Sequence, residues 1–259
     1  MIKRRLTYLL LLVFLLPSGM HSQKWKLRRY EAVFGTGINS YFGDIGGSAS
    51  PDNLFGIKDI SIKSTRPLLY MGARYKIREN ISVKMNFTYG LMSGNDEGSK
   101  NNDRAFKFSS QIFEPSVQAE YSIISEEQKT RSSALFNKRG MINNYSQINL
   151  YLYAGIGAVK HWPKPNEAMM ASVNYDPDHS TFGIVFPVGM GLKYVLSQNW
   201  SIGAEFGVRW TTTDLLDAYT SPYSKANDLY YFGVINGIYR IKTSRTGLPV
   251  FGKRARSFL

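Results

Sequence analysis

The sequence contains no cysteine, so the chain forms no disulfides and is not expected to be a lipoprotein anchored through an N-terminal cysteine. Long hydrophobic runs are also missing: beyond Gln23, no window approaches 18 consecutive apolar residues. This excludes a helical membrane protein unless the N-terminal segment is retained as an anchor. The rest of the chain is therefore expected either to be soluble or to cross a membrane as strands.

The N-terminus has the pattern of a secretory signal peptide. Basic residues at positions 3–5 precede a largely apolar stretch from Leu6 to Leu16, and Pro17, Gly19 and the small residue Ser22 follow. The apolar stretch is too short to cross a bilayer as a helix, which takes about 20 residues. We expect residues 1–22 to be a signal peptide, cleaved near Ser22.

Period-two alternation indicates long β-strands. In residues 182–194, large apolar side chains alternate with small or charged ones, and residues 81–91 and 201–210 repeat the pattern. Such segments have the length of about ten residues that a tilted membrane-spanning strand needs, whereas soluble strands usually have about five or six. The polar face of these strands, with its small or charged side chains, is the narrow face. The 17 tyrosines, 15 phenylalanines and 23 glycines suit aromatic, glycine-spaced strands.

The spacing of these segments predicts an all-β fold, an eight-stranded antiparallel transmembrane barrel of the outer membrane with a closed lumen. Connections of alternating length give four long outer loops, three inner turns and both termini in the periplasm. Trp25 and Trp200 would mark the periplasmic interface, and Trp162 and Trp210 the outer one. A bulge is expected near Ile112, where strand 106–123 changes phase, and the last strand, 229–242, is poorly phased.

Charged residues on the narrow, polar face of the strands predict a network of charges inside the lumen. An eight-stranded barrel is just wide enough to be filled by side chains, so a conducting pore is not expected. Four acidic and five basic groups nearly cancel, and an unpaired charge in so tight a space would be costly. We interpret them as a charge-paired plug, with a proton or substrate path as the alternative. The predicted members are Glu31, Arg74, Lys76, Lys84, Glu114, Glu120, Lys193, Glu205 and Arg209.

Residues for catalysis are few. Outside the signal peptide, the only histidines are His161 and His179, and both are expected in outer loops. His179 and Ser180, beside Asp176 and Asp178, could form a hydrolase site or hold a surface cation, but neighbouring loop residues have no fixed geometry. We therefore predict no catalytic, cofactor-binding or metal-binding residues and no small-molecule substrate.

Basic residues gather at the two ends of the mature chain: Lys24, Lys26, Arg28 and Arg29 before the first strand, and Lys242, Arg245, Lys253, Arg254 and Arg256 around and after the end of the last. In the predicted barrel (23–242) and its C-terminal tail (243–259), both sets lie in the periplasm, where nucleic acid is not an expected partner. They could serve solubility, attract anionic lipid, or dock an acidic periplasmic protein.

Two segments resemble a known family. The stretch from Glu31 to Ile45, EAVFGTGINSYFGDI, and Gly72-Ala-Arg-Tyr75 with a tight turn into the 81–91 strand are similar to PorG-like outer-membrane barrels of the Bacteroidetes type IX secretion system. The resemblance implies a non-enzymatic component that ties the periplasmic ring of PorK and PorN to the outer membrane, beside the translocon. The alternatives are an orphan barrel that acts through its outer loops, as an adhesin or membrane-stabilising protein, and an outer-membrane lipid hydrolase.

Overall fold

The computed structural model describes most of the chain between Lys26 and Val250, namely residues 26, 28–46, 64–97, 99, 101–126, 147–178, 180–220, 227–244 and 247–250. The predicted signal peptide, 1–22, lies outside the described residues, and so do Lys24, Trp25 and residues 251–259.

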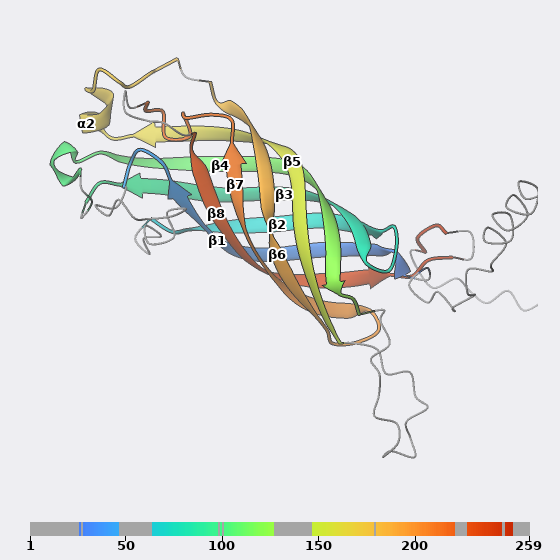
Figure 1. Cartoon of the computed structure of the whole chain (residues 1–259). Coiled ribbons are helices and arrows are strands. Elements are labelled where there is room, and N and C mark those ends of the chain that lie inside the picture. The colour runs from blue at the N-terminus through green and yellow to red at the C-terminus, as the bar shows by residue number, and fades with distance from the viewer. Residues whose placement is uncertain are drawn as a thin grey trace, which may run out of the picture.

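Eight antiparallel strands form one closed barrel, each paired with its neighbours in sequence (Figure 1). The first and last strands pair along their whole length, from Tyr30 with Ile241 to Phe42 with Leu229, and so close the sheet. The predicted eight-stranded antiparallel barrel is confirmed. The strands are β1 (Tyr30–Phe42), β2 (Arg66–Lys76), β3 (Ile81–Asn95), β4 (Lys107–Ile124), β5 (Ile148–Pro165), β6 (Phe182–Val195), β7 (Trp200–Thr211) and β8 (Leu229–Ile241).

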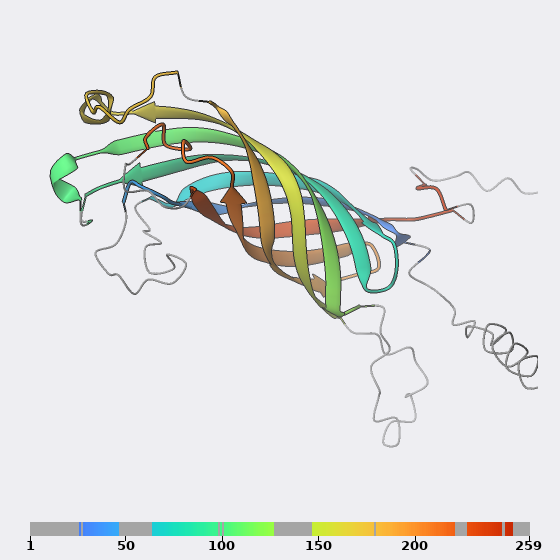
Figure 2. The ribbon, with the colours of Figure 1, turned by 45° about the horizontal axis from the view of Figure 1, so that its top comes forward.

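The two ends of the barrel differ. We call the end with the short connections 77–80 and 196–199 the turn end; the start of β1 and the end of β8 lie there too. At the opposite, loop end, β3, β4 and β5 project beyond the other strands, as Figure 2 shows. The short helices η3 (Asn102–Arg104) and α2 (Glu167–Met170) lie at this end. Among the described residues, no helix is long and apolar enough to span a membrane.

The outer face of the barrel is apolar because the strands alternate as the sequence predicts. Phe34, Met71 and Ile235 are 48%, 58% and 72% exposed, while the residues next to them in each strand point inward. Trp200 lies on the outer face at the turn end, where its ring centroid is 5.0 Å from that of Tyr239. Trp162 and Trp210 are exposed near the loop ends of β5 and β7.

Two sequence-based expectations are wrong. The pairing of β3 with β4 runs without interruption through Ile112 and Pro115, and the irregularity lies between Ser122 and Ile124 instead. The apparent phase change arises because Phe108 and Ile112 face the interior, which is apolar near the loop end.

His161 is the second correction. Strand β5 extends to Pro165, so His161 is an inward-facing strand residue with no exposed surface and not a loop residue. Its backbone N–H donates to the carbonyl oxygen of Thr181 at 3.0 Å. The segment 161–180 was expected to be one long loop, but its first five residues continue the sheet.

Candidate functional site

The structure brings the predicted lumen charges together, and all nine side chains are buried inside the barrel. Glu31 of β1 is at the centre of the group nearest the turn end. Its carboxylate lies 2.9 Å from Arg74, 3.0 Å from Lys193, 3.5 Å from Arg240 and 3.7 Å from Lys76. One carboxylate therefore contacts four cations from three other strands.

A second carboxylate group lies further into the barrel. Glu205 of β7 accepts from the Lys84 ammonium at 2.7 Å and from the Tyr151 hydroxyl at 2.7 Å. Glu120 of β4 lies 2.8 Å from Lys84 and 2.6 Å from Arg74, which also contacts Glu31. The two groups thus form one continuous network, in which each of the three carboxylates contacts at least two cations.

Sequence reasoning missed two members of this network, Glu126 and Arg240. Glu126 follows β4 and lies 2.5 Å from both Lys76 and Lys193 and 3.4 Å from Arg240. Burial alone would raise the pKa of Glu126, but Lys193 and Lys76 lower it well below its ordinary value. With these two residues, the described interior network holds five carboxylates and six cations.

The network ends where the interior becomes apolar. Arg209 lies 3.5 Å from Glu114, donates to the Tyr153 hydroxyl at 3.2 Å, and its guanidinium carbon is 3.7 Å from the Phe232 ring centroid. Glu114 also accepts from the Tyr230 hydroxyl at 2.5 Å. Aromatic rings and one ion pair therefore separate the charged part of the lumen from the part nearer the loop end.

An apolar cluster closes the loop end of the lumen. It joins inward strand residues to side chains from the loops, and its members are Tyr41, Ile45, Met92, Phe106, Phe108, Ile112, Val159, Met169, Val185, Leu216, Tyr219 and Tyr230. At the turn end, a cavity lined by Arg74, Glu120 and Lys193 has a volume of about 10 Å³, roughly the room one water needs. The described lumen is therefore sealed at the loop end and nearly filled at the turn end.

Two buried carboxyl groups share one tyrosine hydroxyl at the loop end. The Tyr41 hydroxyl lies 2.8 Å from Asp217 and 2.8 Å from Asp228. A hydroxyl has one hydrogen to donate, so the second contact needs a proton on one of the carboxyls. Burial raises the pKa of Asp217 to about 7, and burial together with the charge of Asp217 raises the pKa of Asp228 well above its ordinary value. A Cβ at Gly43 would lie 2.0 Å from this hydroxyl, so the close approach requires glycine.

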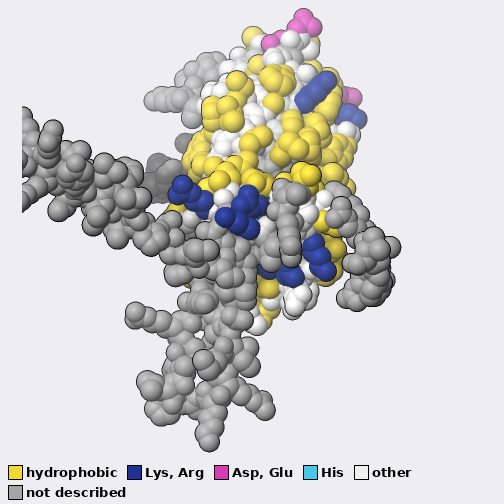
Figure 3. All heavy atoms as spheres, turned by 90° about the vertical axis from the view of Figure 1, so that its right-hand side faces the viewer, with side chains coloured by type: hydrophobic (Ala, Val, Ile, Leu, Met, Phe, Trp, Pro, Cys, Tyr) yellow, Lys and Arg dark blue, Asp and Glu magenta, His cyan; other side chains and the backbone are white. Residues whose placement is uncertain are grey.

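The structure places four of the nine predicted partner-binding residues at the turn end. Lys26 and Lys242 are exposed there. Arg28 donates to the carbonyl and, at 3.1 Å, to the side-chain oxygen of Gln198, and Arg29 donates to the Tyr75 hydroxyl at 3.0 Å. Figure 3 faces this end and shows basic side chains at the border of the apolar belt. The other five, Lys24, Arg245, Lys253, Arg254 and Arg256, lie outside the described residues.

The start of the C-terminal tail is folded against the barrel. Thr243 forms an isolated bridge with Pro249, and the backbone N–H of Val250 donates to the carbonyl of Lys242 at 2.8 Å. The Tyr30 hydroxyl donates to the carbonyl of Gly247 at 3.3 Å. The described part of the tail therefore turns back beside the start of β1, where the backbone N–H of Arg29 donates to the Thr243 hydroxyl at 3.3 Å.

The hydrolase pair weighed from the sequence, His179 and Ser180, is only partly within the described residues. His179 lies outside them. The Ser180 hydroxyl bonds the backbone of Phe182, and Asp176 accepts from the backbone N–H of Asp178 at 3.0 Å. Among the residues that the structure describes, no group of three or more acidic or histidine side chains could hold a metal ion.

Solved structures with a similar fold are small outer-membrane barrels at low identity. The Neisserial surface protein A matches with 10% identity and a TM-score of 0.45 over 82% of this chain and 96% of its own. OprG from Pseudomonas aeruginosa matches with 9% identity and a TM-score of 0.45, over 83% of this chain and 98% of its own. Ail of Yersinia pestis, in complex with the heparin analogue sucrose octasulfate, matches with 13% identity and a TM-score of 0.41, over 82% of this chain and 99% of its own. No curated protein matches the chain. A family model matches residues 3–254, and the chain belongs to this family, which is described as a domain of unknown function (DUF6089).

Proposed function

We propose that the chain is a non-enzymatic barrel of the bacterial outer membrane that anchors a periplasmic protein assembly at its turn end. The observation that supports this most is the sealed lumen beside an exposed basic end. An interior filled by buried charged and apolar side chains leaves no room for transport. Function then lies with the surfaces at the ends of the barrel.

The apolar belt supports the membrane location. A closed barrel satisfies every strand's backbone hydrogen bonds, and large apolar side chains predominate on its outer face from β1 to β8. In outer-membrane barrels, the short turns face the periplasm and the longer loops face outward. The turn end of this chain, with both termini, would therefore lie in the periplasm.

The charge of the turn end supports an acidic protein partner. Lys26 and Lys242 are exposed, and Thr243, next to Lys242, accepts a hydrogen bond from the backbone N–H of Arg29. Complementary charge raises association rates and selects against basic partners. On the motif resemblance at Glu31–Ile45, the partner we propose is the periplasmic ring of the type IX secretion machinery, of the PorK and PorN kind, beside its outer-membrane translocon.

The test is an affinity pull-down from detergent-solubilised membranes of the native host, with co-purified proteins identified by mass spectrometry. Four forms are compared: the full chain, a chain ending at Lys242, the double variant Lys26→Gln/Lys242→Gln, and the control Lys107→Gln/Lys164→Gln. The control removes the same charge from the loop end. Both Lys107 and Lys164 are exposed there.

We expect the full chain and the control to recover ring proteins, and the turn-end variant and the truncated chain to lose them. Recovery that falls steeply with added salt would support an electrostatic contact. Absence of ring proteins from the full chain, or equal recovery with both double variants, would refute the proposed docking and direct attention to the outer loops.

A further inference from the structure

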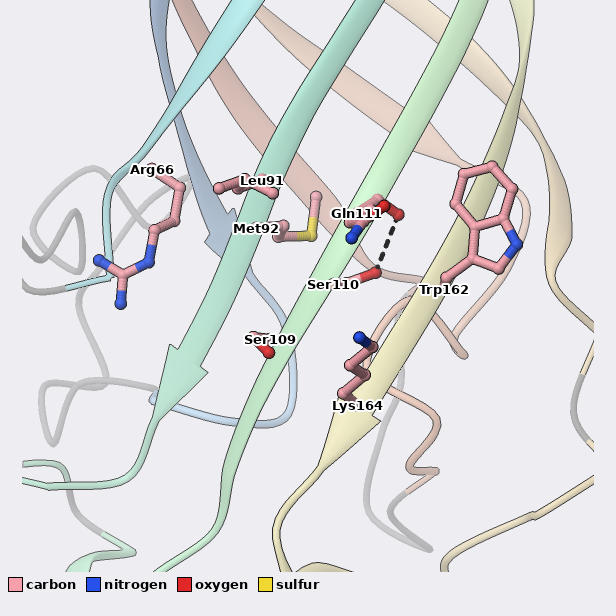
Figure 4. Close-up of a pocket in the computed structure, with 8 residues that line it drawn as sticks. All are labelled: Arg66, Leu91, Met92, Ser109, Ser110, Gln111, Trp162 and Lys164. Carbon is pink, nitrogen blue, oxygen red and sulfur yellow. Dashed lines mark hydrogen bonds between the residues drawn. The ribbon is translucent and has the colours of Figure 1, made fainter.

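A groove crosses the outer face of the barrel near the loop end. It spans β2 to β5, has a volume of about 180 Å³, and is drawn in Figure 4. Its apolar lining includes Leu91 and the Trp162 ring, which are 41% and 40% exposed. Arg66 lies at one side and Lys164 at the other, and none of the described residues that line it is acidic.

Strand β5 arranges its cations on the same face as the tryptophan. Lys160, Trp162 and Lys164 are spaced two residues apart, so all three point outward, and all three are exposed. The Lys160 ammonium lies 5.3 Å from the centroid of the Trp162 ring. On β4, Ser109 and Gln111 add hydrogen-bonding groups to the same groove.

The groove continues into the apolar belt. Further along the outer faces of β4 and β5, toward the turn end, lie Phe113, Val117 and Ile156, which are 39%, 48% and 56% exposed. Tryptophan and lysine side chains at this height lie where headgroups meet acyl chains in a membrane. A molecule that fits both parts has a negative head above the tryptophan and apolar chains along the belt.

We propose that this groove binds the phosphate-bearing headgroup of an anionic membrane lipid. The argument rests on the membrane location proposed above and on charge complementarity: Lys160 and Lys164 of β5 lie beside a groove whose described lining is not acidic, and the apolar surface next to it suits acyl chains. A water-soluble protein partner would have to displace lipid from this belt. The lipid is therefore the occupant that the surface favours.

The test uses quenching of Trp162 fluorescence by brominated lipids. The full chain, carrying Trp25→Phe, Trp200→Phe and Trp210→Phe, is reconstituted in phosphatidylcholine vesicles. A small fraction of the lipid is either dibromo-phosphatidic acid or dibromo-phosphatidylcholine. The same comparison is made for Lys160→Gln/Lys164→Gln and for Lys107→Gln. Lys107 is an exposed lysine of β4 outside the groove, 3.6 Å from Glu97. If the chain with the three Trp→Phe changes folds poorly, a second measure is available. Quenching is compared between the otherwise native chain and its Trp162→Phe variant, and the difference is the contribution of Trp162.

We expect dibromo-phosphatidic acid to quench Trp162 more than its mole fraction in the vesicle predicts. The association constant of phosphatidic acid relative to phosphatidylcholine should fall about fivefold for each lysine removed from β5. The Lys107→Gln variant should keep the preference. Equal quenching by the two lipids, or equal losses in the Lys107→Gln and β5 variants, would overturn the site. If dibromo-phosphatidylcholine quenches nothing, the barrel is not inserted and the proposed membrane location fails instead.

Discussion

Removing the carboxylate of Glu31 is expected to destabilise the barrel more than any surface change. In Glu31→Gln, the network would retain six cations but only four carboxylates. Deleting one partner of a buried ion pair typically costs about 3 to 5 kcal/mol. We expect a loss near 3 kcal/mol, the lower limit, because the cations that lose Glu31 retain other carboxylates. Lys193 and Lys76 still contact Glu126, and Arg74 still contacts Glu120.

The measurement is urea unfolding in detergent micelles, followed by the gel mobility of unheated samples and by tryptophan fluorescence. The matched control is Glu97→Gln, because Glu97 also pairs with a lysine, at 3.6 Å, but both side chains are more than half exposed. Screened pairs of that kind contribute about 0 to 1 kcal/mol. Adding Lys193→Met to Glu31→Gln should recover part of the loss because it reduces the surplus positive charge. A loss no greater than that of Glu97→Gln would refute the ion network as a source of stability.

Three further predictions concern packing, pH and the seal. In the same urea assay, Gly191→Ala should lower the free energy of unfolding by about 1 to 3 kcal/mol, because the new Cβ would lie 2.3 Å from the Tyr151 ring. Gly233→Ala is the control and should change this free energy little, because no atom lies closer than 3.8 Å to the new Cβ. Hydrogen exchange in 214–220, corrected for intrinsic rates, should be slower at pH 5 than at pH 8. The raised pKa of Asp217, about 7 against 3.8, gives stability that is complete below pH 4 and lost as the pH rises through 7. Asp228→Asn should flatten this dependence, and an unchanged profile would contradict the shared proton. In planar bilayers the barrel should show no conductance steps; a steady open channel would contradict the sealed lumen.

The sequence was sufficient to predict the strands and the charged part of the lumen. Period-two alternation over long segments leaves a lysine such as Lys84 only the interior to face, because lipid excludes it. The same reasoning failed for Glu126, which lies just beyond the strand in a segment predicted to be a connection. Its side chain is nevertheless buried against Lys76 and Lys193.

The interior changes character along its length, and this explains the errors in phase. Inward residues of β8 run from Tyr230 and Phe232 at the loop end to Asn236 and Arg240 at the turn end. A rule that assigns apolar residues outward and polar residues inward predicts an interrupted strand at β8, although the backbone of β8 is regular. The pairs joining Tyr41 to Asp217 and Asp228 are 176 and 187 residues apart, so no local pattern could have predicted them.

The pairing of β1 with β8 also determines when the turn end is complete. These strands are joined only after nearly the whole chain has been placed, since Tyr30 meets Ile241. If the docking proposed above is right, the basic residues before β1 and those around the end of β8 would be two separate weak ligands until the seam closes. In the closed barrel they would act as one bivalent ligand with a high effective concentration. A partner that needs both would bind closed barrels and not those still assembling, so its attachment would report that folding is complete.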